Sequence, residues 1–157
     1  MSEGELRLAT PGAPRLRLGG RLGTEAEAIA RAEAALKSLS GNFEAWMADE
    51  LAKIGAARAR IDFEGLNHAT GEELYMRAHD LKGLGATYQY PIVTLIAGSL
   101  CKLIHDPAGR TVENMPLIDA HLAAIRRAVG DQVRAEDDPW AAAIIASLEA
   151  RVAAGRG

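Results

Sequence analysis

The chain has 157 residues, of which 48% are hydrophobic and only 4% aromatic, and its formal net charge is −3. This length suits one domain with a sizeable core, and the hydrophobic content excludes a chain that is disordered throughout. The near balance of 18 basic and 21 acidic residues provides no basic stripe, so we expect no nucleic-acid partner.

Three further features predict the compartment. A single cysteine, Cys101, excludes an internal disulfide and fits a reducing environment. The first residues, Met-Ser-Glu-Gly-Glu, have no apolar core like that of a signal peptide. No run approaches the roughly 20 apolar residues that a membrane span needs. The sequence therefore predicts a cytoplasmic protein with no membrane partner.

The N-terminal residues 1–23 are rich in Gly, Pro and Arg and show no sustained hydrophobic period, which predicts a flexible tail. From Thr24 the pattern is helical, and Thr24 with Glu27 matches a capping box that opens a helix to about Leu39. Gly41 and Asn42 follow, and they predict that this helix ends before the next one begins.

A second helix is predicted over about 43–61, where apolar residues recur at helical spacing. A turn at 65–68 follows. Thr70 with Glu73 then forms another capping-box pattern, which predicts a helix from about 71 to 88. The residue before Pro91 is disfavoured in helical geometry, so a boundary is expected there.

The rest of the chain predicts three more helices, at about 92–104, 111–133 and 139–154, separated by a turn at 106–109 and a charged break at 136–138. Short connections favour antiparallel neighbours.

We therefore predict an all-α fold: an up-and-down antiparallel four-helix bundle with an extra N-terminal and an extra C-terminal helix. Residues 24–157 would form a single helical domain whose core bundle spans about 41–134.

The predicted helix 71–88 has two distinct faces. Apolar or small residues at offsets of 4, 3, 4 and 3 form a seam that would face the bundle: Leu74, Ala78, Leu81, Gly85 and Tyr88. A second stripe beside the seam carries different chemistry: Tyr75, His79, Lys82, Gly83 and Ala86.

This second stripe suits phosphoryl chemistry. An imidazole has an ordinary pKa of about 6.5, so its neutral form is a nucleophile near pH 7. A positive charge such as that of Lys82, about 5 Å from a phosphate oxygen, contributes roughly 1–3 kcal/mol at dielectrics between water and a protein surface. Gly83 costs a helix about 1 kcal/mol relative to Ala. We interpret it as a gap that leaves room beside His79 for a phosphoryl group and a docking partner.

The run His79-Asp80-Leu81-Lys82-Gly83 resembles the H-x-x-K-G motif of histidine-containing phosphotransfer (HPt) domains of bacterial and eukaryotic phosphorelays. The resemblance covers about residues 41–134, although the motif itself is five residues long. It implies that His79 is the phosphoacceptor, that Lys82 stabilises the phosphoryl group, and that Gly83 keeps access open.

The resemblance also implies the partners, which are receiver domains of response regulators or hybrid histidine kinases. Such receivers would bring the acceptor aspartate and Mg²⁺, so we expect no cofactor on this chain. Docking is expected on the His79 stripe and the adjoining face of the next helix, at Tyr75, Ala86, Thr94 and Gly98.

Three alternative functions are an ATP-dependent enzyme, a histidine-kinase dimerisation segment and a helical adaptor. No glycine-rich phosphate loop followed by Lys and Ser or Thr is present, so we expect no ATP site and a phosphocarrier rather than an autonomous enzyme. A histidine-kinase dimerisation segment resembles H-E-x-x-T/N-P, whereas here Gly83 and Leu84 replace the last two positions. A helical adaptor that binds receivers or other signalling partners without chemistry stays open.

The remaining histidines, His68, His105 and His121, do not predict a metal site. The carboxylate-bridged metal sites of helical bundles need a Glu three residues before a His, and no histidine here has one.

Overall fold

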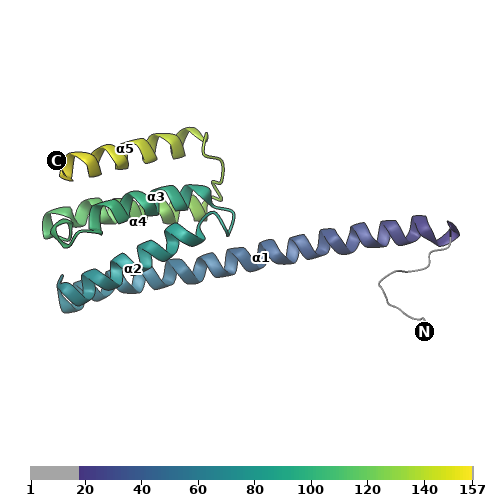
Figure 1. Ribbon diagram of the computed structural model, residues 1–157, viewed down its shortest axis with the longest axis horizontal. Coiled ribbons are helices and arrows are strands. Elements are labelled where there is room, and N and C mark those ends of the chain that lie inside the picture. Colours follow the sequence, from purple (N-terminus) through teal and green to yellow (C-terminus); the bar gives the residue numbers. More distant parts are fainter. Residues whose placement is uncertain (1–17, 157) are drawn as a thin grey trace. The chain divides into compact units, whose positions relative to one another are not determined.

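The structure is a computed structural model that describes residues 18–156. Within these residues there are five α-helices and no strand, which confirms the predicted all-α class (Figure 1). The α-helices are α1 (Leu18–Glu64), α2 (His68–Leu84), α3 (Pro91–Ile104), α4 (Met115–Gly130) and α5 (Pro139–Arg156). Two short 3₁₀ helices, η2 (Pro107–Gly109) and η3 (Val112–Asn114), lie between α3 and α4.

The predicted break in the first helix is wrong, because α1 runs through both Gly41 and Asn42. Neither residue removes a backbone hydrogen bond, and one glycine costs only about 1 kcal/mol among good helix formers. The helix also begins at Leu18 instead of Thr24, so residues 18–23 of the predicted tail are helical. The rest of that predicted tail lies outside the described residues.

The chain divides into two compact units, Met1–Gly41 and Asn42–Gly157. Residues 23–41 of the first unit are all exposed, including the apolar side chains of Ile29, Leu36 and Leu39. All candidate site residues belong to the second unit.

The capping box of α2 lies three residues earlier than predicted. Asn67 is the N-cap of α2: its side chain accepts a hydrogen bond from Thr70 N (3.0 Å), and its own N–H donates to Thr70 Oγ1 (2.9 Å). Thr70 is therefore the third residue of the helix and is fully buried. Gly65, with φ of +86°, provides the turn that makes this early start possible.

The later helices start near their predicted positions. α3 begins at Pro91. α4 begins at Met115, four residues later than predicted, because Thr111 caps the short η3 instead. α5 begins at Pro139, and its first turn is capped by Asp138, whose side chain accepts a hydrogen bond from Ala141 N (3.0 Å).

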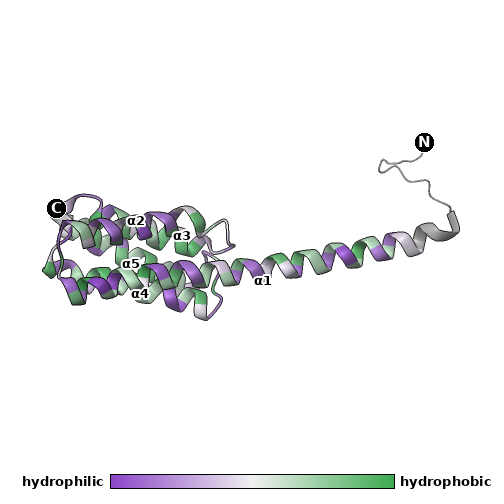
Figure 2. Ribbon diagram, turned by 90° about the horizontal axis from the view of Figure 1, so that it is seen from below, coloured by the Kyte–Doolittle hydropathy of each residue, from purple (hydrophilic) through white to green (hydrophobic). Residues whose placement is uncertain are grey.

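In the second unit α3 is the central helix, since it contacts α2, α4 and α5. The helices of this unit carry both hydrophobic and hydrophilic residues (Figure 2), and the hydrophobic ones meet in one core. Apart from Tyr90, the largest fully buried side chains come from the second half of α1 and from α2, α3 and α4: Met47, Ile54, Leu74, Leu81, Ile92, Ile96, Leu100, Leu103, Ile104, Ile118 and Ile125.

A polar cluster joins the end of the α2–α3 loop to this core. Tyr90 is 0% exposed, and its hydroxyl donates to the Glu44 carboxylate (2.9 Å to Oε2). The Arg134 guanidinium lies 4.3 Å from the centre of the Tyr90 ring and pairs with Glu44. Burial, and then the Glu44 carboxylate, raise the pKa of Tyr90 to about 12, so the phenol stays protonated as a donor.

Candidate functional site

The two predicted faces of α2 are present. On the seam, Leu74, Ala78 and Leu81 are buried in the core. On the second stripe, His79, Lys82, Gly83 and Ala86 are exposed and Tyr75 is half-buried. A 3.6-residue period places neighbours in sequence on different sides of the helix, which is why Leu81 is buried and Lys82 is exposed.

The exposed stripe lines an open hollow of about 340 Å³ between α2 and α3. α2 contributes Tyr75, His79 and Lys82; α3 and its C-cap contribute Gly98, Cys101, Lys102 and His105. A water molecule takes about 30 Å³ in the liquid, so the hollow holds a phosphoryl group with room to spare. The site therefore combines the exposed imidazole of His79 with two ammonium groups and a second imidazole.

The Lys82 side chain crosses toward α3. A Cβ placed on Gly98 would lie 4.0 Å from both Cδ and Cε of Lys82. Burial raises the pKa of the Cys101 thiol, and the Lys82 ammonium acts in the opposite direction because it lies close enough to favour a thiolate. The Lys82 charge is thus placed in the hollow that His79 lines.

Gly83 and Gly85 have opposite surroundings. A Cβ on Gly83 would have nothing within 4 Å, so this glycine is open, as its predicted role requires. A Cβ on Gly85 would lie 2.7 Å from both N and Oγ1 of Thr94, so the two helices approach too closely there for any side chain. Gly85 is therefore a close packing point, as the seam predicts.

Thr94 and Ala86 are joined to each other. The Ala86 N–H donates to Thr94 Oγ1 (2.8 Å), which gives a partner to a backbone group just beyond the end of α2. α2 accordingly ends at Leu84, four residues earlier than predicted, and residues 85–89 form a turn. Thr94 thus holds the α2–α3 connection, and its predicted docking role stays a prediction.

Two residues that the sequence analysis does not assign to the site contact Tyr75, and a third lines the same hollow. The Tyr75 hydroxyl lies 3.2 Å from His105 Nδ1, and the Arg110 guanidinium lies 5.7 Å from the centre of the Tyr75 ring. Lys102 lies on the same wall of the hollow as His105. Positions 98, 101, 102 and 105 fall on one face of a helix, so their spacing from Gly98 could have revealed this wall.

The other histidines have different environments. His121 is fully buried, with Nδ1 2.8 Å from Leu117 O and Nε2 3.0 Å from Ser99 Oγ. The carbonyl accepts from Nδ1–H and the hydroxyl donates to Nε2, so both nitrogens of a neutral ring are satisfied. Burial lowers the pKa of His121 and favours this neutral form. His68 is the exposed first residue of α2.

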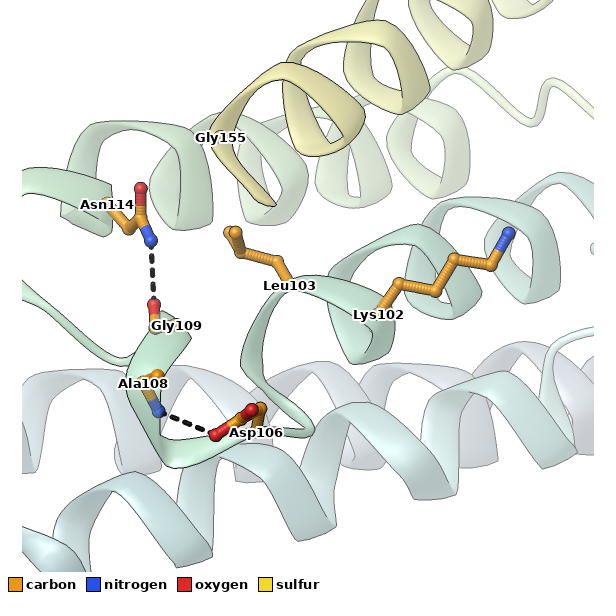
Figure 3. Close-up of a pocket in the computed structure, with 7 residues that line it drawn as sticks. All are labelled: Lys102, Leu103, Asp106, Ala108, Gly109, Asn114 and Gly155. Atoms are coloured by element: carbon orange, nitrogen blue, oxygen red, sulfur yellow. Dashed lines mark hydrogen bonds between the residues drawn. The ribbon is translucent and has the colours of Figure 1, made fainter. Parts of the chain in front are cut away.

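A second hollow lies beside the C-terminal end of α3 (Figure 3). Two of its polar side chains stabilise the loop: Asp106 accepts a hydrogen bond from Ala108 N (2.9 Å), and Asn114 Nδ2 donates to Gly109 O (2.8 Å). Lys102 lines this hollow as well as the one beside His79. Among the residues that the structure describes, none that lines this second hollow carries an imidazole, so it offers less chemistry than the one beside His79.

Across the part of the chain that the structure describes, no three His, Cys, Asp or Glu side chains gather closely enough to hold a metal ion. No helix within residues 18–156 combines the length and the apolar character needed to cross a membrane. Compared with protein-family models, with curated proteins and with solved structures, the chain matches none of them.

Proposed function

We propose that this chain is a histidine phosphotransfer protein, in which His79 carries a phosphoryl group between receiver domains of a two-component phosphorelay. The observation that carries the proposal is the exposed imidazole of His79, which shares an open hollow with Lys82 one helical turn away. The open backbone at Gly83 supports it, because a partner's reacting group needs unobstructed approach.

The transfer step follows from these groups. The lone pair of an unprotonated His79 nitrogen forms an N–P bond as the P–O bond of an aspartyl phosphate on the receiver breaks. The electron pair of the broken bond leaves on the receiver's carboxylate. The reverse reaction, with the aspartate of another receiver as the nucleophile, unloads the histidine. Such transfer depends mainly on in-line positioning and charge stabilisation, and Lys82 provides positive charge on this side.

The arrangement of helices fits this role. We propose that the second half of α1 with α2, α3 and α4 forms an up-and-down antiparallel four-helix bundle, to which α5 is added as an extra helix. A receiver would dock over Tyr75, Ala86, Thr94 and Gly98 and would bring its own Mg²⁺. Because the contact is transient, its area should stay below about 1,200 Å² in total. The proposed setting is the cytoplasm.

The test is phosphoryl transfer from phosphorylated receiver domains of the same organism to the full chain. We expect label on the wild-type chain and none on His79→Gln. The matched control is His68→Gln, which changes another exposed histidine of α2 and should be labelled normally. A receiver that binds the chain tightly but never labels it would indicate the adaptor instead, and equal labelling of His79→Gln would exclude His79 as the acceptor.

A further inference from the structure

The wall of the hollow opposite α2 carries donors of its own. Lys102 and His105 line the same hollow as His79 and Lys82, and they come from α3 and its C-cap. An anion in this hollow would therefore meet N–H donors from two helices. The H-x-x-K-G pattern supplies one side of such a pocket and contains neither of these residues.

His105 is held in one orientation by Tyr75. The Tyr75 hydroxyl lies 3.2 Å from His105 Nδ1, so Nε2 is the ring nitrogen left for a ligand. The Tyr75 ring also lies beside both imidazoles, with centre-to-centre distances of 6.0 Å to His79 and 5.5 Å to His105. When the phenol donates to Nδ1, the neutral imidazole carries its proton on Nε2 and remains a donor.

Arg110 contacts both Tyr75 and His105. Its Nε donates to Ile104 O (2.8 Å), its Nη1 pairs with Glu72 (2.6 Å), and its guanidinium packs against Tyr75. The Arg110 guanidinium lowers the pKa of the Glu72 carboxyl, which therefore remains ionised to hold the arginine. Tyr75 and His105 are thus fixed before any ligand arrives, as a binding site requires.

We propose that His105, oriented by Tyr75, and Lys102 are positioning residues that hold the phosphoryl oxygens on His79 and prolong the life of the phosphohistidine. This inference rests on the proposed function, since it assumes His79 as the phosphoryl carrier.

The chemistry gives the direction of the effect. Hydrolysis breaks the N–P bond while a water oxygen joins phosphorus, and the freed imidazole nitrogen takes up a proton. The N–P bond breaks more readily once the phosphorylated ring is protonated, because neutral imidazole is then the leaving group. Donors on the phosphoryl oxygens and nearby positive charge both oppose that protonation, so they slow hydrolysis.

The test uses the full chain labelled chemically with phosphoramidate, which gives its phosphoryl group to an imidazole and releases ammonia. The half-life of label on His79 is followed by mass spectrometry that resolves each histidine. We expect the label to decay about 3- to 10-fold faster in His105→Ala and in Lys102→Met, because each variant loses one charge-assisted hydrogen bond at an open site. Tyr75→Phe, which removes only the hydroxyl, should show a smaller acceleration.

Matched controls separate this effect from a general one. His68→Ala and Lys37→Met change exposed residues that do not line the hollow, and both should decay at the wild-type rate. His105→Lys restores an N–H donor and should recover much of the lost half-life, which a merely structural role for His105 would not explain. Urea unfolding confirms that each variant is folded.

A wild-type half-life in both His105→Ala and Lys102→Met would overturn the inference. Because the label is introduced without a receiver, this result is independent of transfer. Chains that show the expected half-lives but accept no phosphoryl group from any receiver would overturn the proposed relay function and leave the phosphoryl pocket standing.

Discussion

The paired helices α2 and α3 have a core side and a hollow side, and similar residues behave differently on each. On the core side Gly85 has no room for a Cβ, and the ring of His121, which comes from α4 and packs against Ser99 of α3, has a partner on each nitrogen. On the hollow side Gly83 has nothing within 4 Å, and His79 is exposed. The role of a glycine or a histidine here therefore depends on what fills the space beside it, and residue type alone does not assign it.

The largest effect on stability is expected for Leu81→Ala, on the core side. Leu81 is 0% exposed, so the substitution should lower the free energy of unfolding by about 2–5 kcal/mol. Lys82→Ala, one residue further along, should change it by less than about 0.5 kcal/mol. Urea unfolding measures both, and equal effects would show that the two faces of α2 are not distinct.

Gly85→Ala should have the next largest effect. The added Cβ would meet the backbone nitrogen of Thr94 at 2.7 Å, so α2 and α3 must separate at a cost of about 1–3 kcal/mol. The same urea experiment measures this loss. An unchanged stability would mean that the two helices can move apart freely at this point.

His121 should make the stability depend on pH. Burial lowers its pKa in the folded chain, so the unfolded chain binds more protons and stability falls as the pH drops below about 6.5. One such group contributes at most about 1.4 kcal/mol per pH unit. Urea midpoints at pH 7.5 and 5.5 should differ less in His121→Gln than in the wild type. The same pH dependence in both chains would assign the effect to other groups.

A small effect on stability, of opposite sign, is expected for Gly83→Leu. Nothing obstructs the new side chain, and leucine forms helix better than glycine, so the chain should become more stable by up to about 1 kcal/mol. Transfer from a receiver should nevertheless slow, because the side chain fills the approach to His79. Gly41→Leu, at another open glycine within a helix, should leave transfer unchanged. Normal transfer by Gly83→Leu would remove any role for this glycine in access.

The two faces of α2 and the starts of α3 and α5 could be predicted from the sequence, because periodicity and proline act locally. The start of α2 could not be predicted reliably. Asn67 with Thr70 and Thr70 with Glu73 both resemble capping boxes, and only the first pair forms the reciprocal hydrogen bonds at the start of α2. The predicted break at Gly41 failed because a weak local preference does not end a helix whose flanking residues favour it.

One wall of the candidate site could be predicted and the other could not. The first wall comes from a five-residue motif on a single helix, which contains His79, Lys82 and Gly83. The proximity of these residues therefore follows from the helix itself. Tyr75 and His105 are 30 positions apart, and they meet because α2 packs against α3. Contacts of that kind depend on the packing of two helices, which no spacing within a single helix specifies.

The most direct test of the central claim is the location and chemical stability of the phosphoryl label after transfer from a receiver domain. We expect a label on His79 that is lost in acid and survives in alkali, because it is held by a phosphorus–nitrogen bond. A label that survives acid, or one that lies on another residue while His79 stays unmodified, would contradict it.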